Sequence, residues 1–314
     1  MGSSQKFYGV LLLVQLLFGI QYVASKYVLS ALPPLVWASL RATAAAFLFG
    51  LTAYFLGKLD PKRALQQAKP LIVFALLSTA INQGCFLYGL TYTTVTNSAL
   101  LNTLIPVFTL LIVTCTGREH FSLVKFIGTG IALLGALSLN RFEDLSLSNQ
   151  TFLGDLLTIA NSLCYSFFLA FSKPFLEREN RLWATTWFFI YGCVALWVLS
   201  IPQWSDINVP PFSWEVTGAM IFSVVGGTFL TYLLVNYAIA HVPASVVALF
   251  IYLQPIIAGG MGWWLLNESI TPRTLVSAGL IFVGVYLSVQ KSNAKAKSLS
   301  QNLFRNEAVR KARW

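Results

Sequence analysis

Charged residues are scarce in this sequence of 314 residues. They make up 10% of it, whereas a typical soluble domain holds about 25%. Hydrophobic residues make up 56%, and the mean hydropathy is +0.69. This balance excludes a soluble globular domain and indicates a protein of the lipid bilayer.

Acidic residues are the rarer of the two charged types. There are 11, all in loops or at the ends of hydrophobic runs. A carboxylate in the middle of a membrane can carry protons and balance the charge of an organic cation. Because none lies there, we expect no carboxylate proton relay, and a neutral or zwitterionic substrate in preference to a bare cation.

Metal-binding and catalytic residues are also few. The two histidines have no second ligand at metal spacing, and the four cysteines lie in apolar runs without a CxxC pair. The HExxH and GxSxG motifs are missing, which disfavours an integral-membrane enzyme. We expect no catalytic residue, no metal and no cofactor; an enzyme or a receptor stays as the alternative of another class.

Long hydrophobic runs are what the sequence has in quantity. Each is long enough to cross about 30 Å of hydrocarbon as an α-helix. We therefore expect an all-α integral membrane protein with ten transmembrane helices. The runs are residues 7–29, 34–56, 71–91, 94–116, 122–139, 153–174, 182–202, 215–239, 242–266 and 271–290.

Lysine and arginine are distributed unevenly between the loops. If the N-terminus is cytoplasmic, 17 of the 21 fall on the cytoplasmic side and two in outer loops. Cytoplasmic loops carry such an excess, so both termini are predicted to be cytoplasmic. The net charge of +10 and the basic tail at 291–314 then indicate an anionic lipid surface nearby, and no nucleic acid.

The two halves of the chain resemble each other. A shift of 149 residues superimposes, without gaps, residues that have positional meaning. We expect a first repeat at 1–140 and a second at 152–290. Five spans per repeat would invert the second repeat relative to the first, as in many secondary transporters. The matched residues include Pro106 and Pro255, Glu119 and Glu268, Gly130 and Gly279, and Gly135 and Gly284.

Polar side chains inside the predicted spans are the candidates for a substrate cavity. Interhelical hydrogen bonding is the alternative, because it needs the same residue types. For Lys26 and Arg41, which lie near span ends, the alternatives are attraction of a substrate carboxylate and anchoring of the helix. The candidates are Gln15, Gln21, Lys26, Arg41, Asn82, Tyr88, Asn102, Asn161, Tyr165, Tyr232, Asn236, Tyr237 and Gln254.

The matched prolines and acids have local interpretations as well. Pro106 and Pro255 free a backbone carbonyl and bend their helices, so each is either a hinge or a packing kink. Glu119 and Glu268 lie in turns at helix starts, where a carboxylate complements the helix dipole. We expect these two acids to be structural caps.

Several short motifs resemble a known family. They are Lys26 and Arg41 within KYVLSALPPLVWASLR, Tyr88-Gly89-Leu90, Gly117-Arg118-Glu119 followed by Gly130 and Gly135, and Asn267-Glu268 followed by Gly279 and Gly284. Together they resemble the ten-helix exporter branch of the drug/metabolite transporter superfamily, which has two EamA domains. Phe18-Gly19 departs from the Trp-Gly that is frequent in the family.

The resemblance implies a secondary transporter of small metabolites, most often amino acids or drugs, in a bacterial inner membrane. Carriers of nucleotide sugars or phosphate esters are the alternative within the superfamily. They would need several lysines or arginines at the cavity, and the sequence offers two. The substrate, the direction of transport, the coupling ion and the oligomeric state are left open.

Overall fold

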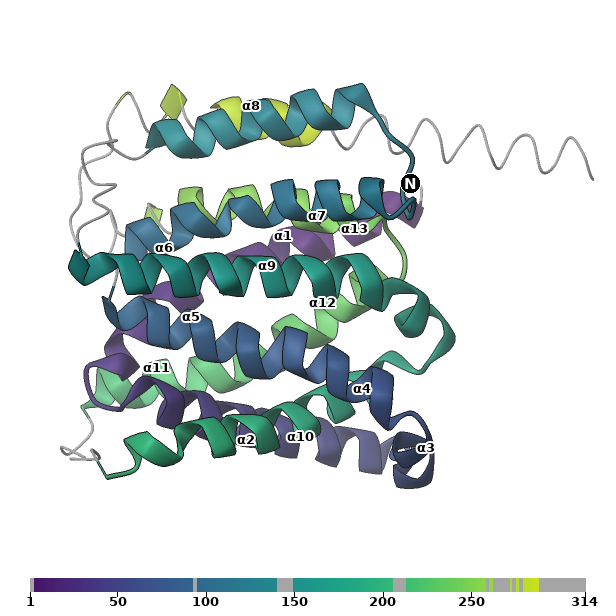
Figure 1. Ribbon diagram of the computed structural model, residues 1–314, viewed down its shortest axis with the longest axis vertical. Coiled ribbons are helices and arrows are strands. Elements are labelled where there is room, and N and C mark those ends of the chain that lie inside the picture. The colour runs from purple at the N-terminus through teal and green to yellow at the C-terminus, as the bar shows by residue number, and fades with distance from the viewer. Residues whose placement is uncertain are drawn as a thin grey trace, which may run out of the picture.

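The computed structural model describes residues 3–92, 95–139, 149–205, 213–257, 260–261, 272, 275–276 and 279–287. Within these residues the backbone is helical, with turns and short connections and no β-strand. The long helices run side by side in Figure 1, and the N-terminus lies at one end of the bundle. This is the all-α membrane architecture that the sequence predicts.

The helices follow the hydrophobic runs. They are α1 (Ser3–Leu29), α2 (Pro34–Phe55), α3 (Pro61–Gln66), α4 (Ala68–Ala75), η1 (Leu76–Ala80), α5 (Ile81–Tyr92), α6 (Val95–Asn102), α7 (Leu104–Cys115), α8 (Leu123–Leu139), α9 (Asn149–Arg178), α10 (Arg181–Ser200), η3 (Ile201–Gln203), α11 (Trp214–Val224), η4 (Val225–Leu230), α12 (Thr231–Ile239), α13 (Ala244–Leu249) and η5 (Phe250–Leu253).

Local chemistry explains several helix boundaries. Pro34 begins α2, at the position where its missing N–H costs nothing. Asn180 caps α10 by accepting a hydrogen bond from the Trp183 backbone at 3.2 Å. Gly57 and Gly117 follow α2 and α7 with φ of +61° and +67°, a conformation that glycine adopts without strain.

Six helical segments are long and apolar enough to cross a membrane, judged by length and composition. They match six of the ten predicted spans. The predicted span 94–116 is not one continuous helix, because α6 and α7 are separated at Thr103. Eight residues of the predicted span 271–290, together with its Glu268 turn, lie outside the described residues. The number ten therefore stays a prediction.

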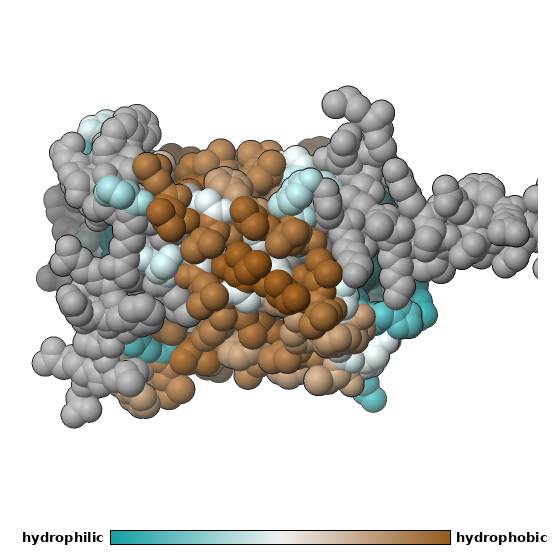
Figure 2. All heavy atoms as spheres, turned by 90° about the horizontal axis from the view of Figure 1, so that it is seen from above, coloured by the Kyte–Doolittle hydropathy of each residue, from teal (hydrophilic) through white to brown (hydrophobic). Residues whose placement is uncertain are grey.

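The outer surface is apolar around the middle of the bundle. Figure 2 shows one face with hydrophobic residues across its centre and hydrophilic residues toward the ends. Leu123, Ile127 and Leu134 of α8 are among the exposed apolar side chains. Such a belt matches the hydrocarbon layer of a bilayer, and it needs no further protein cover.

Helices from the two halves of the chain pack against each other in matching pairs. Helix α2 packs along α10, and α5 packs along α9. Helices α11 and α12 pack on α1 in the corresponding way. A shift of 149 residues relates α1 to α9, α2 to α10, and α5 to α12.

The same shift relates the irregular segments. The π-helical segments η1 (Leu76–Ala80) and η4 (Val225–Leu230) begin 149 residues apart, each within the third span of its half. The fourth span is also irregular in both halves: it breaks at Thr103 in the first, and becomes the 3-10 segment η5 in the second. The two π-helical segments were not predicted, whereas the irregular fourth spans lie just before Pro106 and Pro255, where the sequence predicts a bend.

Two glycines make a reciprocal contact between α8 and residues 279–287. A Cβ at Gly135 would lie 2.9 Å from the backbone N of Ile281, and one at Gly284 would lie 2.6 Å from the backbone N of Ala132. The shift of 149 residues relates Gly135 to Gly284 and Ala132 to Ile281, so the two contacts are equivalent. At Gly130 and Gly279, by contrast, a Cβ would meet nothing within 4 Å, so these two glycines do not serve close packing among the described residues.

Candidate functional site

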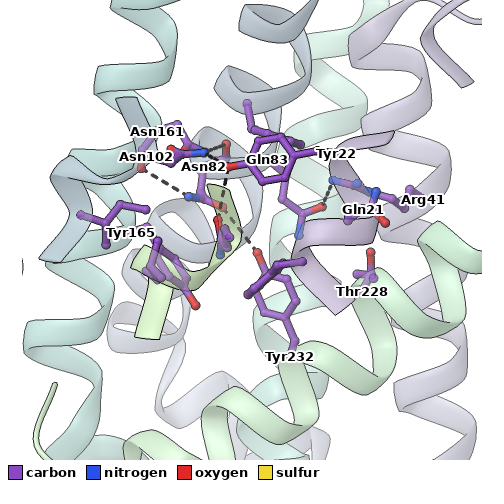
Figure 3. Close-up of a pocket in the computed structure, with 16 residues that line it drawn as sticks. Gln21, Tyr22, Arg41, Asn82, Gln83, Asn102, Asn161, Tyr165, Thr228 and Tyr232 are labelled. Carbon is purple, nitrogen blue, oxygen red and sulfur yellow. Dashed lines mark hydrogen bonds between the residues drawn. The ribbon is translucent and has the colours of Figure 1, made fainter. Parts of the chain in front are cut away.

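A pocket lies about halfway along the long helices and is lined by residues of both halves of the chain (Figure 3). The free space in it and in its opening, which includes open solvent, measures about 580 Å³. The lining combines amide, aromatic and one cationic side chain. It consists of Phe18, Gln21, Tyr22, Arg41, Asn82, Gln83, Phe86, Asn102, Ile105, Asn161, Tyr165, Gly227, Thr228, Tyr232, Ile251 and Gln254.

The irregular segments position much of this lining. Asn82 and Gln83 follow η1 directly, whereas Gly227 and Thr228 lie within η4. Ile251 belongs to η5. A π-helical turn contains one residue more than an α-helical turn allows, and such turns are frequent at functional sites. The irregular segments thus supply part of the lining, and the regular helices α1, α2, α9 and α12 supply most of the rest.

One chain of hydrogen bonds joins side chains from both halves. The Gln254 amide donates to Gln15 Oε1 at 2.7 Å, and Gln254 Oε1 accepts from the Tyr22 hydroxyl at 3.3 Å. That hydroxyl accepts from the amide of Asn102, whose Oδ1 accepts from Ser162 Oγ at 2.8 Å. Each link satisfies a buried polar group that would otherwise be unfavourable in a membrane.

A second cluster ties η1 and α5 to α9 and α12. Asn82 and Asn161 donate to each other's backbone carbonyls at 3.3 and 2.9 Å. The Tyr232 hydroxyl donates to the Ser78 carbonyl at 3.0 Å and lies 3.4 Å from Asn82 Oδ1. These hydrogen bonds thus connect, within the pocket wall, elements that are more than 75 residues apart in sequence.

Arg41 is buried in this wall, with 3% of its surface exposed. Its Nη2 donates to Gln83 Oε1 at 2.9 Å, as Figure 3 shows. The Nε of Arg41 has no hydrogen-bond partner among the described residues, nor do Gln83 Nε2 and the Tyr165 hydroxyl. The wall therefore holds several buried donors without a hydrogen-bond partner among the described residues.

Gln21 is held in place by its amide nitrogen, which donates to Ser25 Oγ and Ser223 Oγ, both at 3.0 Å. Its oxygen has no partner in the described part of the chain and faces Gly227. A Cβ at Gly227 would lie 1.9 Å from that oxygen. The glycine is thus required for Gln21 to occupy this position.

The structure brings most of the predicted cavity residues together. Those that line the pocket are Gln21, Arg41, Asn82, Asn102, Asn161, Tyr165, Tyr232 and Gln254.

The other predicted cavity residues lie elsewhere. Gln15 and Asn236 are buried between helices, where Gln15 bonds to Gln254 and Asn236 donates to Thr185 Oγ1 at 2.8 Å. Lys26 donates to the Leu90 carbonyl at 2.8 Å, which favours the anchoring alternative for this residue. Tyr88 bonds to Tyr92 at the end of α5.

Tyr237 also lies outside the pocket, near the end of α12. It packs against Phe7 and His241, and the Arg181 guanidinium lies 5.3 Å from its ring centre. This cluster closes one end of the bundle between α1, α10 and α12.

The sequence did not single out the apolar part of the lining. Phe86, Ile105 and Ile251 look like any other apolar residue of a span, and Tyr22 is buried like a core residue. Gln83 was the one that could have been found, because it is a second amide beside Asn82 in the same span. Gly227 and Thr228 line the pocket because they lie in the π-helical segment η4. The hydrophobic periodicity of the sequence does not reveal such a segment.

The matched prolines lie next to the irregular parts of their spans. Pro106 is the third residue of α7, just after the break at Thr103, and Pro255 comes soon after η5. Their role as hinges stays a prediction. Within the described residues, no group of three His, Cys, Asp or Glu side chains could hold a metal ion.

Comparison with known proteins identifies relatives along nearly the whole chain. The uncharacterized transporter YoaV of Bacillus subtilis (strain 168) is 23% identical over 277 residues, which cover 88% of this chain and 94% of that protein. An uncharacterized transporter of Archaeoglobus fulgidus is 26% identical, covering 90% of this chain and 98% of its own. The WAT1-related protein At3g18200 of Arabidopsis thaliana is 23% identical, covering 91% and 82%.

A solved crystal structure has the same fold. It superimposes with a TM-score of 0.78 at 15% identity and covers 92% of this chain and 98% of its own. The family model described as "EamA-like transporter family" matches twice, at residues 6–141 and 152–290. The predicted family is confirmed: this membrane protein belongs to the EamA-like transporter family.

Proposed function

We propose that the protein carries small organic metabolites through the pocket by alternating access between its two halves. The observation that carries this proposal is a polar pocket lined from both halves, midway along the helices. Substrate sites of transporters with inverted repeats lie in this position. Amino acids and similar small compounds that can form several hydrogen bonds are the proposed substrates.

The recurrence of irregular segments supports the internal repeat. Both η1 and η4 lie in the third span of their halves, and both contribute residues to or beside the pocket. If the second half is inverted, exchanging the conformations of the halves would open the pocket to the opposite side. We also infer that both termini face the cytoplasm, because the lysines and arginines favour that side.

Exchange in proteoliposomes tests the proposal. Vesicles are loaded with one unlabelled amino acid or small organic acid at a time, and entry of the labelled compound is followed with and without a pH gradient. We expect protein-dependent exchange of some of these compounds. We expect it to be insensitive to the gradient, because none of the described lining residues is acidic.

Two tryptophan substitutions provide a matched control. Phe86→Trp fills the pocket and should lower exchange, whereas Phe47→Trp makes the same change on a side chain that is 67% exposed, and should not. Folded protein that exchanges none of the compounds would contradict the proposal. If the two variants exchange equally, the substrate does not pass through this pocket.

A further inference from the structure

We propose that Arg41 binds a carboxylate of the transported molecule. This inference rests on the proposed transport function and refines its substrate class. The substrate would be a small organic compound with a free carboxylate and an apolar or aromatic body. Amino acids and simple carboxylic acids share this chemistry.

The burial of Arg41 is the first observation. Its guanidinium lies in the middle of the protein with 3% of the residue exposed, and it lines the pocket. A guanidinium keeps its charge at any physiological pH. A buried ion that lacks an opposite charge is strongly unfavourable, so a partner is expected.

No carboxylate of the protein takes that place. None of the described lining residues is acidic, and Arg41 takes part in none of the ion pairs formed among the described residues. Those ion pairs use Glu119, Glu177 and Glu179 with other bases. In the sequence, all 11 acids belong to loops or span ends.

The free donors are the second observation. Arg41 can only donate, so the oxygen of Gln83 must face it and the Gln83 amide nitrogen is left as a donor. Arg41 Nε, Gln83 Nε2 and the Tyr165 hydroxyl are all buried without a partner in the described part of the chain. A carboxylate offers about four acceptor sites and one negative charge, which suits the Arg41 guanidinium with the Gln83 amide beside it.

Other ligand chemistries fit this pocket less well. A neutral carbonyl could accept from the donors but would leave the positive charge of Arg41 unbalanced. A phosphate dianion would bring more negative charge than one guanidinium balances. An organic cation would add a second positive charge to a pocket in which no described lining residue is acidic.

The rest of the lining suits an apolar body. Phe18, Tyr22, Phe86 and Tyr232 surround the same space, and the rings of Tyr22 and Phe86 meet edge to face with centroids 5.3 Å apart.

Matched ligand pairs test the inference on the purified full chain in detergent. 3-Phenylpropionate and 3-phenylpropanamide differ only in the carboxylate, and so do phenylalanine and phenylalaninamide. The ligand-induced rise in unfolding temperature gives the affinity of each. Charged hydrogen bonds predict that an acid binds about 10- to 100-fold more tightly than its amide.

The variants locate this preference. Arg41→Gln should abolish it, and Arg41→Lys should keep part of it because the charge remains. Lys26→Gln removes a cation that does not line the pocket, so it should leave the ratio of acid to amide affinity unchanged. Unfolding of each variant without ligand shows whether it is folded, and Arg41→Lys serves if Arg41→Gln is not.

The outcomes separate the two proposals. Tight binding of both acids, or of phenylalanine alone, supports the inference and shows whether an ammonium is needed as well. An amide that binds as tightly as its acid, a preference that survives in folded Arg41→Gln, or no binding of either acid would overturn it. If the neutral amides are then exchanged in proteoliposomes, the transport proposal stands and the carboxylate inference does not. If no compound is exchanged, both the transport proposal and the carboxylate inference are contradicted.

Discussion

Gly227 of η4 lies directly against the Gln21 side chain of α1. The oxygen of Gln21 occupies the space where a Cβ of residue 227 would lie. A larger residue would push Gln21 away from Ser25 and Ser223, and would change the polar wall of the pocket. Gln21 can therefore occupy its place in the lining only because residue 227 has no side chain.

We expect Gly227→Ala to lower the free energy of unfolding by about 1–2 kcal/mol, because two hydrogen bonds of Gln21 are strained or lost. Gly218→Ala in α11 is the control, since nothing lies within 4 Å of its Cβ. It should be neutral or stabilise by up to about 1 kcal/mol. Thermal unfolding in detergent measures both. An equal loss in a Gln21→Ala background, where the clash is gone, would contradict this explanation.

The polar candidates were predictable one by one, because an amide or tyrosine inside an apolar run needs a partner. Their partners were not predictable. Asn102 and Asn236 look alike in the sequence, yet Asn102 lines the pocket and Asn236 bonds to Thr185 between helices. Arg41 was predicted to be either an anchor or a ligand for a carboxylate, and its burial favours the second.

Glu119, in the turn after α7, connects helices from the two halves of the chain. Glu119 accepts from Lys125 Nζ at 2.7 Å, from the Ser245 backbone at 3.1 Å and from the Ser245 hydroxyl. The sequence predicts a helix cap at this residue. The structure shows that the capped helix is α13 of the other half, so the same carboxylate holds three elements together.

Loss of the Glu119 carboxylate should therefore destabilise the protein. We expect Glu119→Gln to cost about 2 kcal/mol, somewhat below the 3–5 kcal/mol of a fully buried broken pair, because the two side chains are 15% and 10% exposed. Glu177→Gln is the control. Its pair with Lys173 is far more exposed and should cost less than about 1 kcal/mol.

A double-mutant cycle measures the interaction free energy between Glu119 and Lys125. It compares the chemical unfolding of Glu119→Gln, of Lys125→Met and of the variant that combines them. The double variant should cost less than the sum of the single ones, because it leaves no charge unpaired with its former partner. Additive losses would show that the ion pair itself does not join these elements.

For the whole molecule, six of the ten predicted spans match helices that are long and apolar enough to cross a membrane, since hydrophobic length can be read from the sequence. The irregular fourth spans lie just before Pro106 and Pro255, where the sequence predicts a bend. The π-helical segments could not be predicted, because η1 consists of ordinary span residues.

The orientation of the molecule is testable with fusions. A fluorescent protein attached after Trp314 should fluoresce, because folding in the cytoplasm preserves it. Alkaline phosphatase inserted within residues 141–148 should be active, because that loop is predicted to lie outside. The opposite pair of results would reverse the proposed orientation, and two cytoplasmic results would change the number of spans in the first half.

The segments η1 and η4 have one more consequence. Each amounts to a single residue inserted into an α-helix, and the widened turn takes up the rotation of about 100° that this residue would otherwise add. The residues that follow therefore keep the direction they would have in a regular helix one residue shorter. We expect a deletion of one residue in η1 to restore a regular helix and to leave Asn82 and Gln83 in the wall. These two places can thus absorb a one-residue change in chain length that, in a regular part of the same span, would turn the following lining residues away from the pocket.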